Sequence, residues 1–119
     1  MSEDSLHSPD VVRISVTGPE ASLLPVSTIK QAAISLLAKV SPHNVPQAKD
    51  ILHYLVQKGC IYYLRFPTID KTHVANLYGK SITVGQYSYK FYSPEDDQVR
   101  ILFFLLFYTF YALVNLLVY

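Results

Sequence analysis

The stretch Gly79-Lys80-Ser81 has the residue types that could hold a phosphate group. In a phosphate-binding loop, backbone N–H groups and a lysine surround the phosphates, and the motif needs a further glycine five residues before the second one. Position 74 is valine, so the loop lacks the residue that would let it wrap around a nucleotide. We therefore expect a hairpin turn here and no bound cofactor.

The histidines and the single cysteine are the other residues that could support catalysis or bind a metal. His7, His43, His53 and His73 have no partner at helical i, i+4 spacing and no Cys or carboxylate cluster at the spacing of metal ligands. Cys60 begins an apolar stretch, where a small buried side chain is expected. The sequence predicts neither an enzyme nor a metal site.

Residues 101–119 contain no charged residue, Gly or Pro. As a helix they would extend about 28 Å, close to the hydrocarbon thickness of a bilayer. We therefore expect a single C-terminal transmembrane helix, with a helix buried in a protein core as the alternative. Every Lys and Arg precedes this segment, which predicts a tail-anchored protein with its body in the cytosol. The absence of a basic C-terminal flank favours the endoplasmic reticulum or secretory system and leaves a mitochondrial membrane open.

The expected helix has a clear start and a polar side. Ser93-Pro94-Glu95 combines a capping serine, a proline at the first helical position and an acid in the first turn, so we expect one helix from about Pro94 to Tyr119. Four polar residues fall within an arc of about 80° on it: Tyr108, Tyr111, Asn115 and Tyr119. This stripe predicts contact with another helix, or alternatively Tyr119 serves only as an interfacial anchor.

The first half of the body shows two clear periodic patterns. β-branched residues alternate over residues 11–17, which predicts a strand. Apolar residues then recur at helical spacing from Ser27 to Val40, which predicts an amphipathic helix. Its inward-facing residues are expected to be Ile29, Ala32, Ala33, Leu36, Leu37 and Val40.

The second half predicts a further helix and several strands. The helix would begin at Asn44, end at Gly59 and bury Ala48, Ile51, Leu52, Leu55 and Val56. A strand follows at residues 61–66. A meander is then expected at about residues 73–78, 81–84 and 87–92, with turns at Gly79 and Gly85, or alternatively one longer strand with a bulge at Gly85.

These elements together predict an α+β, winged-helix-like body of two or three helices plus a β-hairpin or meander, followed by the transmembrane helix. The segment Leu55-Val56-Gln57-Lys58-Gly59-Cys60-Ile61, after Pro46-Gln47-Ala48, resembles the centre of a DEP domain, a membrane-targeting winged-helix module. The later aromatic strand Tyr87-Ser88-Tyr89-Lys90-Phe91 resembles another part of that family. The resemblance covers about residues 27–92 and implies docking on a membrane protein or on acidic lipid.

The distribution of charge divides the chain into three segments. Residues 1–10 are acidic and expected to be disordered, residues 11–92 form the domain with nine basic and three acidic side chains, and residues 93–119 form the capped helix. A net charge of +6 on the domain favours attraction to anionic headgroups, by about 1 kcal/mol per basic residue near a membrane. The alternative is an ordinary solvated lysine-rich surface.

The leading functional hypothesis is a non-enzymatic, tail-anchored adaptor whose basic domain docks on a membrane protein or on anionic lipid. The residues expected to bind are Lys49, Lys58, Arg65, Lys71, Lys80 and Lys90. A first alternative is a small accessory or assembly subunit of a multi-subunit membrane complex, with self-association through the tail as a further option. A second alternative is a nucleic-acid-binding module that uses the second helix.

Overall fold

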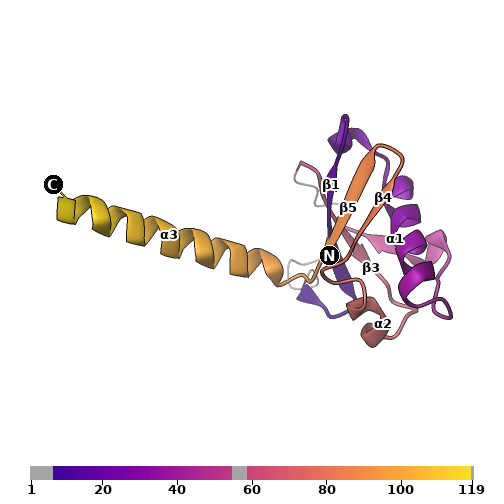
Figure 1. The fold of residues 1–119 in the computed structure, drawn as a ribbon. Helices are drawn as coiled ribbons and strands as arrows, with labels where there is room; N and C mark the ends of the chain where they lie inside the picture. The colour runs from indigo at the N-terminus through magenta and orange to yellow at the C-terminus, as the bar shows by residue number, and fades with distance from the viewer. Residues whose placement is uncertain (1–6, 55–58, 119) are drawn as a thin grey trace.

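The computed structural model describes residues 7–54 and 59–118, with only the backbone described for residues 97–103 (Figure 1). The body is a mixed α/β domain with a five-stranded antiparallel sheet in the order β2-β3-β1-β5-β4. Figure 1 shows α1 packed against one face of this sheet and α3 leaving the body. The elements are β1 (Val11–Thr17), η2 (Ala21–Leu23), α1 (Val26–Val40), η3 (Ala48–Asp50), β2 (Leu52–His53), β3 (Ile61–Arg65), α2 (Lys71–Ala75), β4 (Ser81–Val84), β5 (Tyr87–Tyr92) and α3 (Asp96–Val118).

The central strand of the sheet is β1, which confirms the strand expected at residues 11–17. It pairs with β3 on one side and β5 on the other, so that Ile14 lies opposite Tyr62 and Phe91. Val12, Ile14 and Val16 are buried in the main hydrophobic cluster. Because alternate residues of a strand point to one face, these three define the face that α1 covers.

The amphipathic helix is also confirmed, as α1. Its buried residues are the predicted Ile29, Ala32, Ala33, Leu36 and Leu37, while Val40 is only half-buried. The N-cap is Pro25, two residues before the expected cap Ser27, and the last turn ends where the Ser41 N–H donates to the carbonyl of Leu37. The 3.6-residue periodicity of apolar side chains was therefore sufficient to place this helix and its inner face.

The prediction of a second helix is wrong for residues 44–54, the part of it that the structure describes. The prediction of a winged-helix-like body is therefore wrong as well. Residues 44–54 form only the single 3₁₀ turn η3 and the two-residue strand β2. Pro46 disfavours helical geometry at Val45, and Leu52 and His53 pair with β3. Leu55 and Val56 lie outside the described residues. The main layer opposite α1 is therefore a five-stranded sheet.

The strand expected at residues 73–78 is also wrong. The chain forms the short helix α2 there, because the Asp70 carboxylate accepts hydrogen bonds from the backbone N–H and the hydroxyl of Thr72, at 2.9 and 3.0 Å. This is an N-cap, and it directs Val74 and Leu77 into the core. The hairpin of residues 81–84 and 87–92 is confirmed as β4 and β5, and its turn contains Gly85 with a φ of 62°.

The helix expected between Pro94 and Tyr119 is present as α3, from Asp96 to Val118, and Tyr119 lies outside the described residues. Within the part of the chain that the structure describes, no helix has both the length and the apolar character required to cross a bilayer. The expectation of an integral, tail-anchored membrane protein with a cytosolic body is therefore corrected.

Candidate functional site

The most unusual feature of the molecule is the exposure of α3. Every side chain from residue 104 to residue 118 is exposed, including Phe104 at 68%, Phe110 at 67% and Leu117 at 85%. By contrast, the core residues Phe91 and Leu64 of the body are 0% exposed. Large contiguous apolar surfaces of this kind mark interaction sites in folded proteins.

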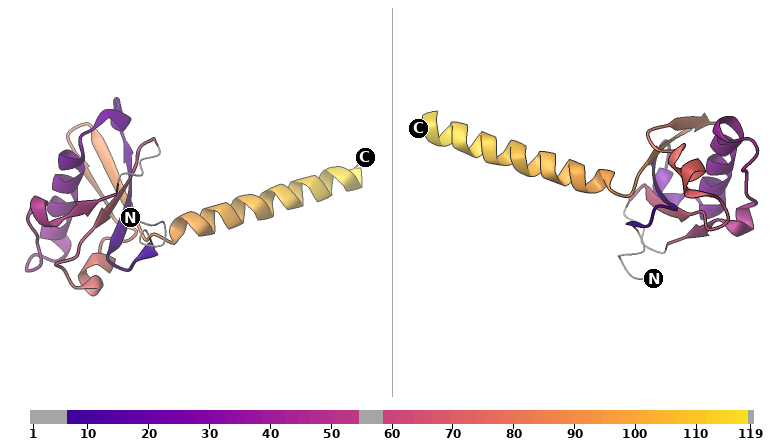
Figure 2. Two further views of the ribbon diagram at one scale, coloured as in Figure 1. Left: turned by 180° about the vertical axis from the view of Figure 1, so that it is seen from behind. Right: turned by 90° about the horizontal axis from the view of Figure 1, so that it is seen from below.

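The helix projects away from the body instead of folding back onto it. In both views of Figure 2, α3 leaves the sheet side of the body as a separate rod, and no other described element lies alongside it. The molecule accordingly measures 59 Å along its longest axis against 31 and 27 Å along the others. Its start follows β5 directly through Ser93 and Pro94, and Pro94 is buried, which ties the base of the rod to the sheet.

Aromatic rings are stacked along one side of α3. The ring centroids of Phe104 and Tyr108 are 6.3 Å apart, and those of Phe107 and Tyr111 are 6.4 Å apart. These i, i+4 pairs border a shallow hollow of about 430 Å³, and the four rings are its lining among the side chains that the structure describes. The hydroxyl of Thr109 donates to the carbonyl of Leu105 at 2.8 Å, so it is satisfied within the helix.

The predicted helix-contact residues Tyr108, Tyr111 and Asn115 are all exposed on this side of α3, and Tyr119 lies outside the described residues. The structure brings Phe104 and Phe107 to the same place, and they were missed from the sequence. The available signal was the spacing of the four aromatic residues, i, i+3, i+4 and i+7, which puts them on one helix face.

The predicted basic binding residues are spread over several elements. Cross-strand partners share a face of a sheet, so Arg65 and Lys90, which pair with Val11 and Ser15, lie on the face away from α1. Lys49 belongs to η3, which packs beside α1. Lys71 begins α2 and Lys80 precedes β4, both exposed, while Lys58 lies outside the described residues. Their role in binding stays a prediction.

One basic residue, Arg13, is buried within the sheet. The guanidinium of Arg13 lies 4.9 Å from the centroid of the Tyr92 ring, and the ammonium of Lys90 lies 5.4 Å from the same centroid. Arg13 is only 1% exposed, so this contact stabilises a buried cation on the central strand. The ring of Tyr92 therefore has a structural role beside the base of α3.

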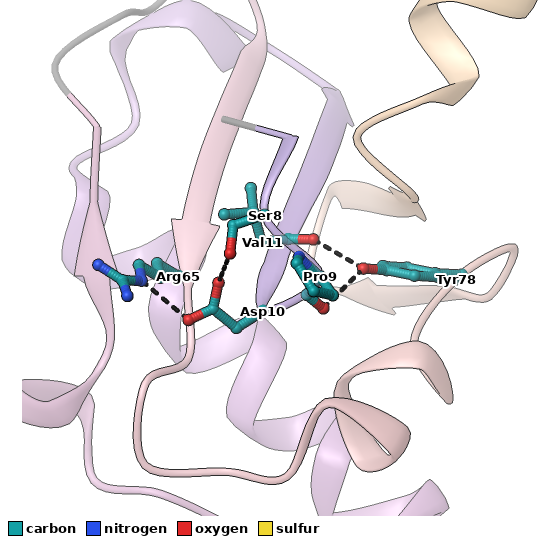
Figure 3. Close-up of polar contacts among 6 residues, drawn as sticks. All are labelled: Ser8, Pro9, Asp10, Val11, Arg65 and Tyr78. Atoms are coloured by element: carbon teal, nitrogen blue, oxygen red, sulfur yellow. Dashed lines mark hydrogen bonds and ion pairs between the residues drawn. The ribbon is translucent and has the colours of Figure 1, made fainter. Parts of the chain in front are cut away.

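A hydrogen-bonded strap holds the described N-terminal residues against the body (Figure 3). The Ser8 hydroxyl donates to one carboxylate oxygen of Asp10 at 2.6 Å, and Arg65 Nε donates to the other at 2.8 Å. On the opposite side the Tyr78 hydroxyl donates to the carbonyl of Val11 at 2.9 Å. Burial by itself raises the pKa of Asp10, but the bonds from Ser8 and Arg65 outweigh it and hold the pKa below its ordinary value.

The strap gives a testable pH dependence. Because the pKa of Asp10 is lower in the folded chain, its carboxylate contributes stability above the unfolded pKa of about 3.9, and this contribution is lost as the pH falls through the folded pKa. We expect Asp10→Asn to lower the urea midpoint at pH 7 and to make little difference at about pH 2. Urea titrations of both chains across this range test it. An equal effect at both pH values would contradict the role of the charge.

A contact between a serine and a histidine elsewhere in the body connects two helices. Ser41 Oγ lies 3.4 Å from His73 Nδ1 and accepts a hydrogen bond of 3.0 Å from Asn76 Nδ2. Ser41 is 5% exposed, and the cluster links the end of α1 to α2. Across residues 7–54 and 59–118, no three His, Cys, Asp or Glu side chains come together as metal ligands would.

No protein-family model, curated protein or solved structure matches this chain. The resemblance to DEP domains therefore stays a prediction from the residues that carry it.

Proposed function

We propose that this protein is a non-enzymatic assembly subunit of a multi-protein complex, in which partner helices enclose α3. The observation that carries the proposal is that residues 104–118 of α3 are uncharged and mostly apolar, with large apolar side chains on every side, and that each of these residues is exposed. A surface helix of an ordinary domain has one apolar stripe, whereas a helix that is apolar all round is normally buried.

The described side chains of α3 take no part in the core of the body. The main hydrophobic cluster draws on the sheet, α1 and the segment around α2, and every member lies between residues 12 and 91. Each Leu or Phe side chain of α3 that becomes buried in a partner would contribute about 1.5–3 kcal/mol. Several such residues supply enough free energy for a stable complex after the cost of association is subtracted.

The enclosing partner is expected to be helical and apolar. Leu106, Phe110 and Leu113 lie at angles well separated from the aromatic side of α3, so a flat surface would leave part of the helix in water. Several helices packed around α3, at the 8–10 Å interaxial distances of helix bundles, would cover all of it.

The test is the native mass of the complex that contains the full-length chain. Leu106→Asp or Leu113→Asp places a charge on α3 at residues that are 58% and 53% exposed in the isolated chain. We expect either variant to lose its partner helices and to run at no more than twice its own 13.5 kDa, because a buried unpaired charge costs several kcal/mol. Light scattering of the purified complexes measures this.

The matched control is Leu23→Asp, which introduces the same charge at a leucine of η2 that is 74% exposed. It should leave the mass of the complex unchanged. A wild-type chain that is always monomeric, or equal loss of mass in Leu23→Asp and Leu106→Asp, would overturn the proposed function.

A further inference from the structure

The aromatic side of α3 has the residue spacing of a two-stranded coiled coil. Positions spaced alternately by four and three residues form one seam along the helix. They are Phe104, Tyr108, Tyr111, Asn115 and Val118, all exposed. In heptad terms, Tyr108 and Asn115 occupy a positions, and the other three occupy d positions.

The hollow on α3 has the composition of a coiled-coil hole. In such structures, each side chain of the seam inserts between four residues of the facing helix. The four rings that line the hollow of about 430 Å³ are those of Phe104, Phe107, Tyr108 and Tyr111, which are a successive d, g, a and d set. That set receives an a-position side chain of a parallel partner, here Tyr108 of a second copy.

Asn115 determines the direction of pairing. An asparagine amide both donates and accepts hydrogen bonds, so two Asn115 side chains facing one another satisfy each other when the helices are parallel and in register. In an antiparallel pair with full overlap of Asp96–Val118, the two amides would be about 24 Å apart along the axis. Each would then be buried among apolar side chains, which is costly.

We infer that α3 pairs with α3 of a second copy of this chain, parallel and in register, through the seam Phe104, Tyr108, Tyr111, Asn115 and Val118. This inference rests on the proposed function, because the pair still presents outward-facing residues such as Leu106 and Leu113 that partner helices must cover. It adds that the complex contains two copies of the chain and that their bodies emerge at the same end.

Disulfide formation in the purified complex that contains the full-length chain, with copper phenanthroline as the oxidant, tests the pairing. In a Cys60→Ala background, Val118→Cys places a thiol on the seam without disturbing the four rings, and Leu117→Cys places one on the neighbouring outward position. The Cα atoms of two facing d positions are about 6 Å apart and those of the outward positions about 13 Å apart. Only the former is within the 4.4–6.8 Å that a disulfide allows.

We expect Val118→Cys to give disulfide-linked dimer in at least ten-fold excess over Leu117→Cys. Adding Asn115→Leu should reduce that excess, because the amide pair no longer fixes the register. Equal crosslinking at the two positions, or none at either while the native complex keeps its mass, would overturn the pairing and leave the proposed function standing. Failure of the proposed function would give a different result, because light scattering would then show that the wild-type chain is monomeric.

Discussion

Replacing Phe91 by alanine is expected to lower the free energy of unfolding of the body by about 3–5 kcal/mol. Phe91 is 0% exposed, lies on β5 and faces Ile14 of the central strand. Its removal leaves a cavity where α1 and the sheet meet, and the rigid surroundings close it only in part. Domains of this size have about 5–15 kcal/mol of stability in total, so much of it would be lost.

Phe110→Ala provides the matched control, because it removes the same side chain from a position that is 67% exposed on α3. It should leave the unfolding free energy of the body unchanged. Urea titrations followed by near-ultraviolet circular dichroism measure both. If Phe110→Ala lowered the free energy of unfolding by a similar amount, α3 would have to pack on the body. That result would contradict the view that the residues that stabilise the body are different from those that bind the partner.

This separation has a consequence for function. The described residues of the main hydrophobic cluster all lie between residues 12 and 91, and the proposed docking residues lie beyond them on α3. Variants can therefore abolish assembly while the body remains folded, which makes the effect of Leu106→Asp interpretable. The body would then serve as a folded base that fixes where α3 begins, through buried Pro94 and the adjoining strand β5.

Periodicity predicted the elements that have one clear apolar face. The strand at residues 11–17 and the helix ending at Val40 were placed correctly because alternation and 3.6-residue spacing are local signals. The apolar residues around Ile51 were assigned to a helix, although the chain there pairs with β3. That pairing is made with residues 64 and 65, and a local pattern carries no information about such a partner.

Two local signals in the sequence agree with the observed structure where the predicted elements do not. Asp70 followed by Thr72 and Val74 is a capped helix start, although the β-branched residues of the same segment favour a strand. Val45-Pro46 argued against a helix from Asn44. For the candidate site, the polar stripe led to Tyr108, Tyr111 and Asn115, whereas the hollow also needs Phe104 and Phe107, which a search for polar residues passes over.

Gly18→Ala is the second substitution with a large expected effect, on the order of 3 kcal/mol of unfolding free energy. Gly18 follows β1 with a φ of 146°, a conformation that L side chains rarely adopt, and the backbone strain adds about 1–2 kcal/mol. A Cβ there would lie 2.5 Å from Cδ1 of Tyr87 and 2.8 Å from the carbonyl oxygen of Gln86. Forcing these atoms apart adds about 1–3 kcal/mol.

Gly85→Ala separates the two contributions, because Gly85 also has a positive φ, of 62°, but a Cβ there meets no atom within 4 Å. It should cost only the backbone strain, about 1–2 kcal/mol. Adding Tyr87→Ala to each chain completes the comparison: it should recover part of the loss in Gly18→Ala and none in Gly85→Ala. If Gly18→Ala and Gly85→Ala lowered the free energy of unfolding equally, backbone conformation alone would explain the glycine at position 18. The close contact between the end of β1 and the start of β5 would then have no part in it.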